Sequence, residues 1–151
     1  FSTYLYTGNG STQVIENGIN LGVENSGGSG YFDGVSDSLS LPNSDTLSMG
    51  TGDFTIEFWV YSEKSSRDNF FLRMLKLAPD GSNAIQLGHI LSGAESTGAI
   101  SYYATSGFAL TGTTDIRNAW HHVALVRNSG TVSLYVDGVS EGTPITDTNK
   151  I

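Results

Sequence analysis

A strict two-residue alternation in one segment constrains the fold of this chain more than any other feature. The segment DFTIEFWVY runs from Asp53 to Tyr61. One face of it is apolar: Phe54, Ile56, Phe58 and Val60. A period of two predicts a β-strand with that face on a core. The other face still carries Trp59 and Tyr61, so we expect it to be half buried or to line a concave surface, with Trp59 packed in the core.

Two further segments near the C-terminus predict an antiparallel hairpin. Trp120–Arg127 and Thr131–Val136 are separated by Asn128, Ser129 and Gly130, which we interpret as a three-residue connection ending in glycine. Asp137-Gly138 predicts a second tight turn directly afterwards. Apolar and polar residues alternate in Thr131–Val136, which is typical of a sheet with one face on a core.

The middle of the chain predicts a meander of strands. Asn69–Leu77 fits both a helical face and strand alternation, and we favour a strand because its neighbours are strands. The sequence PDGSN, Pro79–Asn83, predicts a turn. Ala84–Leu91 and Ile100–Ser106 then predict the next two strands of the same sheet. No segment predicts a helix.

The N-terminal part predicts a separate short segment. Tyr4–Tyr6 and Gln13–Ile15 fit short strands, and the polar stretch Asn25–Gly30 fits a loop or linker. We therefore expect residues 1–26 to form an attachment or linker segment with short strands. Residues 27–151 would then form a β-sandwich.

Composition excludes several classes of partner. A chain of 151 residues is long enough for one domain with its own core. Its net charge is −8 with seven lysines and arginines, so we expect no nucleic-acid partner, because phosphate binding needs clustered cations. No apolar stretch approaches the roughly 20 residues of a membrane span, so we expect no membrane insertion. The absence of cysteine excludes disulfides and thiolate metal sites.

Several phrases resemble the laminin-G-like, or concanavalin-A-like, jelly roll. They are Phe32-Asp33-Gly34 followed by Asp37, the strand Phe54–Val60, the phrase WHHVA at Trp120–Ala124, and LYVDG at Leu134–Gly138. The resemblance implies an all-β fold, a two-sheet antiparallel β-sandwich. It also implies functions in adhesion and glycan binding, and in some members the cutting of polysaccharides.

Two sequence features indicate how this sandwich is completed and where it is located. Domains of the family usually continue past the YVDG turn to a closing strand, which does not appear before Ile151. We therefore expect the sandwich to be truncated at its C-terminus, with the last strand supplied by another chain or by the rest of the polypeptide. The opening YLYTGNGSTQVIENGINL, Tyr4–Leu21, resembles segments of structural proteins of tailed bacteriophages, which implies a virion appendage such as a tail fibre.

The carboxylates do not predict an enzyme. A glycosidase needs two carboxyl groups that face each other, and the family motif ExDxE or ExDxxE is absent. The candidate carboxylates are isolated: Glu57, Glu63 and Glu95. A Ser-His-Asp hydrolase could draw on His89, His121 or His122, but the chain has no GxSxG nucleophile elbow.

The histidines and aspartates do not predict a metal site. On a strand His121 and His122 face opposite sides, so they cannot jointly bind one metal. We expect His122 to be half buried with a backbone partner. Calcium is the alternative, with candidate ligands Asp33, Asp37, Asp45 and Asp53. Because they lack EF-hand spacing, and Asp33 in its turn is better placed to cap backbone N–H groups, we predict no metal and no cofactor.

One tyrosine pair is the candidate ligand site. Tyr102 and Tyr103 could supply an aromatic platform for a sugar, since on a strand one ring faces the core and the other faces solvent or the concave groove. Ordinary sheet packing explains the pair more simply.

These observations predict a non-enzymatic virion structural or adhesion module on a phage tail fibre or other surface appendage. We expect it to bind a host surface glycan or a partner virion protein, and to form a homo-oligomer such as a trimer. Its location would be the virion, outside the cell. One alternative is a secreted or cell-surface bacterial carbohydrate-binding module. A second is a glycoside hydrolase of the same fold.

Overall fold

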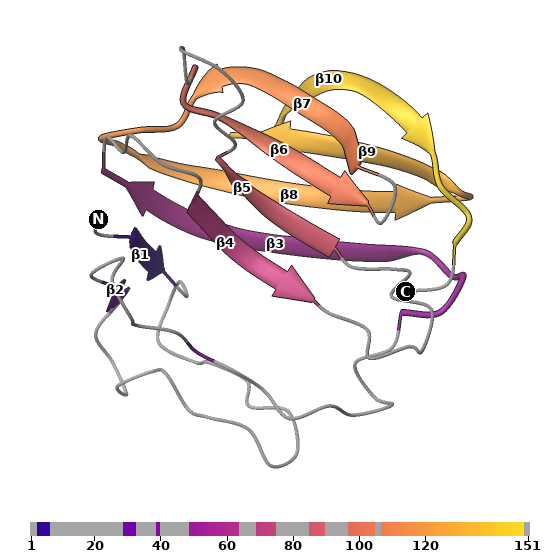
Figure 1. The fold of residues 1–151 in the computed structure, drawn as a ribbon, viewed down its shortest axis with the longest axis horizontal. Coiled ribbons are helices and arrows are strands. Elements are labelled where there is room, and N and C mark those ends of the chain that lie inside the picture. Colours follow the sequence, from indigo (N-terminus) through magenta and orange to yellow (C-terminus); the bar gives the residue numbers. More distant parts are fainter. Residues whose placement is uncertain are drawn as a thin grey trace.

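The structure, a computed structural model, consists of two antiparallel β-sheets (Figure 1). It describes residues 3–6, 29–32, 39, 49–63, 69–74, 85–89, 97–104 and 107–149. The larger sheet has six strands in the order β10-β9-β8-β3-β1-β2. Its strands are β1 (Thr3–Tyr6), β2 (Ser29–Phe32), β3 (Phe54–Ser62), β8 (Trp120–Asn128), β9 (Thr131–Val136) and β10 (Val139–Thr146).

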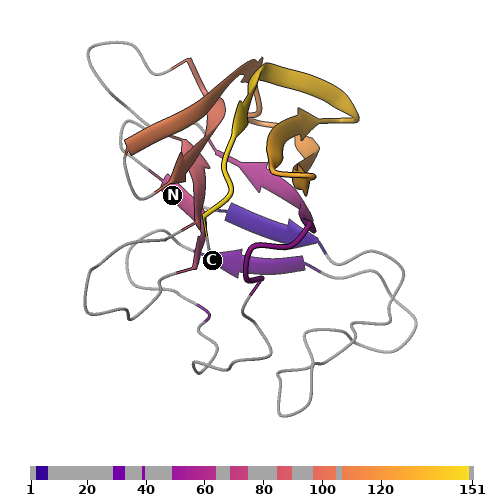
Figure 2. The same ribbon diagram turned by 90° about the vertical axis from the view of Figure 1, so that its right-hand side faces the viewer.

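The smaller sheet is a four-stranded meander in the order β4-β5-β6-β7. Its strands are β4 (Asn69–Met74), β5 (Ile85–His89), β6 (Ala99–Ala104) and β7 (Gly107–Asp115). Figures 1 and 2 show the two sheets from perpendicular directions. The described residues include no helix, so none there is long and apolar enough to cross a membrane.

The core lies between the two sheets and draws on both of them. The six-stranded sheet contributes Val60, Val123, Leu125, Val132, Leu134 and Val136. The four-stranded sheet contributes Ile85, Leu87, Ile100, Tyr102 and Leu110, and the connection after β7 adds Ile116. Burial of these side chains is the main favourable contribution to folding, at roughly 1.5–3 kcal/mol for each large apolar side chain. Alternation along each strand therefore decides which residues face the other sheet.

One buried carboxylate joins the two sheets at an edge. Glu141 on β10 accepts hydrogen bonds from the backbone N–H groups of Thr113 and Thr114 on β7, at 2.5 and 3.2 Å. Both threonine hydroxyls donate to it as well. Burial alone would raise the pKa of Glu141, but these hydrogen bonds outweigh it and the pKa lies below its ordinary value. The carboxylate thus satisfies two edge N–H groups of β7.

The two C-terminal hairpin turns contain two residues each. The predicted three-residue connection after β8 is wrong, because Asn128 pairs with Thr131 and leaves only Ser129 and Gly130 in the turn. Both of these residues have positive φ, as do Asp137 and Gly138 in the next turn. Positive φ at both central positions is the geometry of a type I′ turn, whose twist matches that of the flanking strands.

The predicted all-β antiparallel sandwich is confirmed. Within the expected segment 69–77 a strand forms over Asn69–Met74, and the meander of β4, β5 and β6 is also as predicted. The expected strand Gln13–Ile15 lies outside the described residues. The division into residues 1–26 and 27–151 stays a prediction, although β1 of the first part pairs directly with β3.

Candidate functional site

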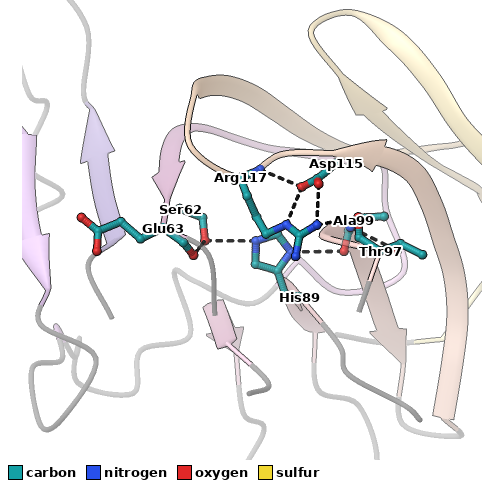
Figure 3. A network of polar contacts seen from close by, with 7 residues as sticks. All are labelled: Ser62, Glu63, His89, Thr97, Ala99, Asp115 and Arg117. Atoms are coloured by element: carbon teal, nitrogen blue, oxygen red, sulfur yellow. Dashed lines mark hydrogen bonds and ion pairs between the residues drawn. The ribbon is translucent and has the colours of Figure 1, made fainter. Parts of the chain in front are cut away.

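A serine and a histidine meet in the core at one end of β3 (Figure 3). The Ser62 Oγ lies 3.0 Å from Nε2 of His89, and Nδ1 of His89 lies 3.2 Å from the carbonyl oxygen of Ala99. Since a carbonyl only accepts, the proton belongs on Nδ1, and Nε2 accepts from the serine hydroxyl. Both side chains are buried. This pair therefore joins β3 to β5 and β6 inside the sandwich.

An ion pair closes the same end of the sandwich (Figure 3). Arg117 Nε lies 2.7 Å from Asp115 Oδ1, and this hydrogen bond is the main cause that lowers the pKa of Asp115. A Cβ at Gly98 would collide with the Asp115 carboxylate, and its φ of +72° strains any residue with a side chain. Glycine is thus favoured beneath the ion pair. Burial lowers the pKa of His89, with a smaller contribution in the same direction from Arg117.

A buried arginine organises the opposite end of β3 and β8. Arg127 donates to the backbone carbonyls of Gly50, Gly52 and Asn149 at 2.7–2.8 Å. Its guanidinium carbon lies 4.7 Å from the centre of the Phe54 ring. Arg127 is 1% exposed, so its charge is satisfied by carbonyl dipoles and an aromatic ring inside the protein.

Of the four calcium candidates, Asp53 lies in the described residues. Asp53 accepts a hydrogen bond at 2.7 Å from the N–H of Ser129, in the turn after β8. The other three candidates, Asp33, Asp37 and Asp45, lie outside the described part of the chain. Among the residues that are described, no three histidine, aspartate or glutamate side chains are close enough to share a metal ion.

The outward face of β3 and β8 carries exposed aromatic rings. Trp59 is 40% exposed, so the expectation that it packs in the core is wrong. The reason is the period of two: the core face of β3 ends in Val60, which forces Trp59 onto the other face. Trp59 pairs in register with His122, and their ring centres lie 5.4 Å apart with planes tilted by 54°.

A second aromatic pair lies one step along the same two strands. Tyr61 pairs in register with Trp120, with ring centres 5.8 Å apart. Trp120 is 41% exposed. Trp59 and Trp120 are diagonal neighbours, for which the Cα separation is about 7–8 Å. The register through β1 places Tyr31, which is 54% exposed, on the same face.

Charged groups border these rings. Glu57 is two residues before Trp59 on β3, and its Oε2 lies 3.6 Å from His122 Nε2. We name Glu57, Trp59, Tyr61, Trp120 and His122 together the outer aromatic face. The ring of His122 thus contacts a carboxylate and an indole, and the expected backbone partner is wrong for it. The histidine with a backbone partner is His89.

A second carboxylate fixes the start of β8. Asp137 accepts from the backbone N–H of His122 at 2.9 Å, and its Oδ2 lies 2.7 Å from Nδ1 of His121. Burial opposes its ionisation, but these hydrogen bonds outweigh burial and the pKa of Asp137 lies below its ordinary value. The two histidines therefore have different carboxylate partners, Asp137 for His121 and Glu57 for His122.

The predicted tyrosine platform is divided between two faces of β6. Tyr102 is buried in the core, where its hydroxyl donates to Asp147 Oδ2 at 3.1 Å and burial raises its pKa. Tyr103 is half buried on the opposite face of β6. Both belong to the four-stranded sheet, so neither joins the outer aromatic face on the six-stranded one.

Sequence reasoning named the members of the outer aromatic face but did not combine them. Glu57, Trp59 and Tyr61 alternate along one strand, and Trp120 and His122 alternate along another. Their pairing depends on the register of two strands about 60 residues apart, which the alternation alone does not give. Of the other carboxylate candidates, Glu63 is exposed just after β3, and Glu95 lies outside the described residues.

Comparison with protein families agrees with this architecture. Residues 32–151, well over half of the chain, match the laminin-G-type model of the concanavalin A-like lectin/glucanases superfamily. Neither the curated proteins nor the solved structures contained a match to the sequence. The match spans the core strands β3–β10 and both strands of the outer aromatic face. The chain therefore belongs to the concanavalin A-like lectin/glucanase superfamily.

Proposed function

We propose that this chain is a non-enzymatic adhesion module that binds a glycan through the outer aromatic face. The observation that carries the proposal is the pair of exposed indoles, Trp59 and Trp120, side by side on two hydrogen-bonded strands. Large apolar groups that gather on a surface mark a site of interaction. Rings held on a sheet lose little freedom when a ligand stacks on them.

Sugar rings suit a surface of this kind. One face of a pyranose carries C–H groups that stack on an indole, and its edge carries hydroxyls that need hydrogen-bond partners. On the outer aromatic face the partners are Glu57 and His122, beside the Trp59 ring. The arrangement therefore offers both contacts that a sugar requires.

Binding without turnover is the second part of the proposal. Hydrolysis on this fold would need two carboxyl groups separated by roughly 5–9.5 Å across the glycosidic bond. Within β3 and β8 the single carboxylate is Glu57. The Ser62 and His89 pair lies in the core, and the buried Glu141 is engaged by two threonines. These positions support a binding role.

We further propose that the module belongs to a virion appendage, such as a phage tail fibre, outside the cell. The resemblance of Tyr4–Leu21 to phage structural proteins supports this setting. Weak sugar contacts gain avidity when several copies act together, so a homo-oligomer such as a trimer fits the role. The alternative setting is a secreted or cell-surface bacterial carbohydrate-binding module, for which the same face would serve.

Glycan binding is tested by screening the purified chain against an array of oligosaccharides and measuring affinities by tryptophan fluorescence. We expect Trp59→Ala and Trp120→Ala each to weaken binding at least ten-fold. Val139→Ala is the matched control, because Val139 is also exposed but lies at the start of β10, away from this face. No binding to any glycan, or equal affinities for all variants, would overturn the proposal.

The virion setting is tested separately by native mass measurement of the chain and by locating it in whole particles. A trimer attached to a particle is the expected result. A monomer that fractionates with secreted bacterial enzymes would favour the alternative setting.

A further inference from the structure

We infer that the outer aromatic face selects uncharged glycans and rejects sulfated, sialylated and uronic ones. The inference rests on the proposed glycan binding and names its substrate class. Three arguments support it. The strands of the six-stranded sheet present no lysine or arginine on this face, the charge beside the rings is negative, and a carboxylate accepts hydrogen bonds from sugar hydroxyls.

The six-stranded sheet presents no permanent cation on this face. Its six strands contain no lysine and one arginine, Arg127. That guanidinium is buried and directed to the carbonyls of Gly50, Gly52 and Asn149. Arg117, in the connection between β7 and β8, is held by Asp115. Recognition of sulfate or carboxylate groups normally uses Arg or Lys, and the strands of this sheet present neither on this face.

The charge of the described residues that borders the rings is negative. The negative charge in contact with this face is that of Glu57, whose side chain is 63% exposed beside Trp59. Protonation of His122 would at most neutralise its neighbour Glu57, 3.6 Å away. An anionic substituent placed within about 5 Å of the Glu57 carboxylate would lose on the order of ten-fold in affinity.

A neutral sugar meets the same groups favourably. A carboxylate has two oxygens with about four acceptor positions, so Glu57 can accept hydrogen bonds from two neighbouring hydroxyls of one sugar ring. Hydrogen bonds to an ionised acceptor are stronger than those between neutral groups. A carboxylate or sulfate on the ligand would bring further acceptors where donors are needed. The substrate class is therefore a polyhydroxylated, uncharged saccharide with a free C–H face.

The experiment compares matched ligands on the wild-type chain. Neutral glucan, galactan, mannan and chitin oligosaccharides are each paired with a sulfated or uronic counterpart, and affinities are measured by tryptophan fluorescence at low and high salt. We expect the neutral member of a bound pair to bind at least ten-fold more tightly. The gap should narrow in high salt, because screening weakens the repulsion of the anionic member.

Substitution of one carboxylate separates the electrostatic effect from the rest. Glu57→Gln should narrow the difference in affinity from both sides, because the anionic member binds more tightly and the neutral member loses hydrogen bonds to an ionised acceptor. Glu57→Lys should narrow it further. Asp53→Asn is the control: it removes one charge before the start of β3, keeps an acceptor for the N–H of Ser129, and should leave the gap unchanged.

The possible failures are distinguishable. Equal or tighter binding of the anionic members, still abolished by Trp59→Ala, would overturn the selectivity and leave the proposed function in place. If the difference in affinity between the neutral and anionic members is the same in Glu57→Gln as in the wild type, Glu57 does not cause the selectivity. That result would also overturn the inference. Absence of binding to any oligosaccharide would overturn the proposed function and the inference with it.

Discussion

The two faces of the β3 and β8 pair are built from alternating residues of the same strands, yet they differ in the burial of their side chains and in how their polar groups are engaged. The inward face carries Val60, Val123 and Leu125 together with two fully buried polar groups, Ser62 and Arg127. All of these side chains are buried, and no buried polar side-chain atom lacks a partner in the described residues. The outward face carries two exposed indoles, a carboxylate and a half-buried histidine.

This difference separates stability from recognition within one pair of strands. On the inward face each polar group is fully engaged, as Arg127 is by three carbonyls and Ser62 by His89. On the outward face apolar area stays in water, although burying it would be favourable. Substitutions on the inward face should therefore change the free energy of unfolding, and those on the outward face should change binding.

The largest expected effect comes from Arg127→Met, which removes the donors to the carbonyls of Gly50, Gly52 and Asn149. We expect the free energy of unfolding to fall by about 3–5 kcal/mol, because three backbone carbonyls lose a charged partner and the buried hydrogen-bond network of the guanidinium is removed. Urea denaturation measures this change in the free energy of unfolding. Arg127→Lys, which keeps the charge but has a compact donor group, should lose less. Wild-type stability in Arg127→Met would contradict the structural role of this arginine.

The next effect comes from Leu125→Ala in the core of β8. Loss of a fully buried leucine should destabilise the chain by about 3 kcal/mol, through lost burial and the cavity left behind. The matched substitution on the other face is Trp59→Ala, for which we expect less than about 1 kcal/mol and a loss of glycan binding. If Trp59→Ala is as destabilising as Leu125→Ala in the same denaturation assay, the assignment of stability to the inward face and of binding to the outward face is wrong.

A third effect is a loss of stability in mild acid. Burial lowers the pKa of His89 below 6.5 in the folded chain, and the neighbouring charges Arg117 and Asp115 act in opposite directions. As the pH falls below 6.5, the unfolded chain binds a proton at His89 that the folded chain does not. The contribution of His89 to stability should therefore be constant above this pH and decrease below it, by at most about 1.4 kcal/mol per pH unit for one proton.

Denaturation measured at a series of pH values tests this effect, with His89→Gln as the comparison. The variant should be less stable near neutral pH but show a flatter profile between pH 6.5 and the acid range of the carboxylates. The lowered pKa values of Asp115, Asp137 and Glu141 cause a separate loss of stability, which begins only as the pH falls below about 4.5. A wild-type profile that is flat from pH 6.5 to 5 would contradict a neutral, buried His89.

The smallest effect comes from Tyr102, which the sequence offered as part of a tyrosine platform for a ligand. Tyr102→Phe removes the hydroxyl that donates to Asp147, whose other oxygen keeps two hydrogen bonds from Asn149. We expect about 1 kcal/mol of destabilisation and unchanged glycan binding. Reduced binding in this variant, with its stability intact, would return Tyr102 to the candidate site. Tyr103→Ala should likewise leave binding unchanged, because β6 belongs to the other sheet.

Local pattern predicted the strands well and their assembly less well. The alternation in Phe54–Val60 located the core face of β3, and the meander of β4 to β6 followed from turn residues and apolar runs. The hairpin after β8 was predicted with one residue too many in its connection. The side of Trp59 was misjudged because a tryptophan adds so much apolar area that core burial is the natural expectation. Alternation was the more reliable guide at this position.

The sequence by itself determined that the chain forms β-strands, where most of them lie, and which residues of a strand share a face, because alternation and turn chemistry act over a few residues. Only the tertiary structure decided that Trp59 stands beside His122, that Tyr61 stands beside Trp120, and that Arg127 reaches Gly50 and Asn149. These contacts join segments far apart in the chain. Register and sheet packing fix them, and both depend on the burial of the whole core, which no short segment contains.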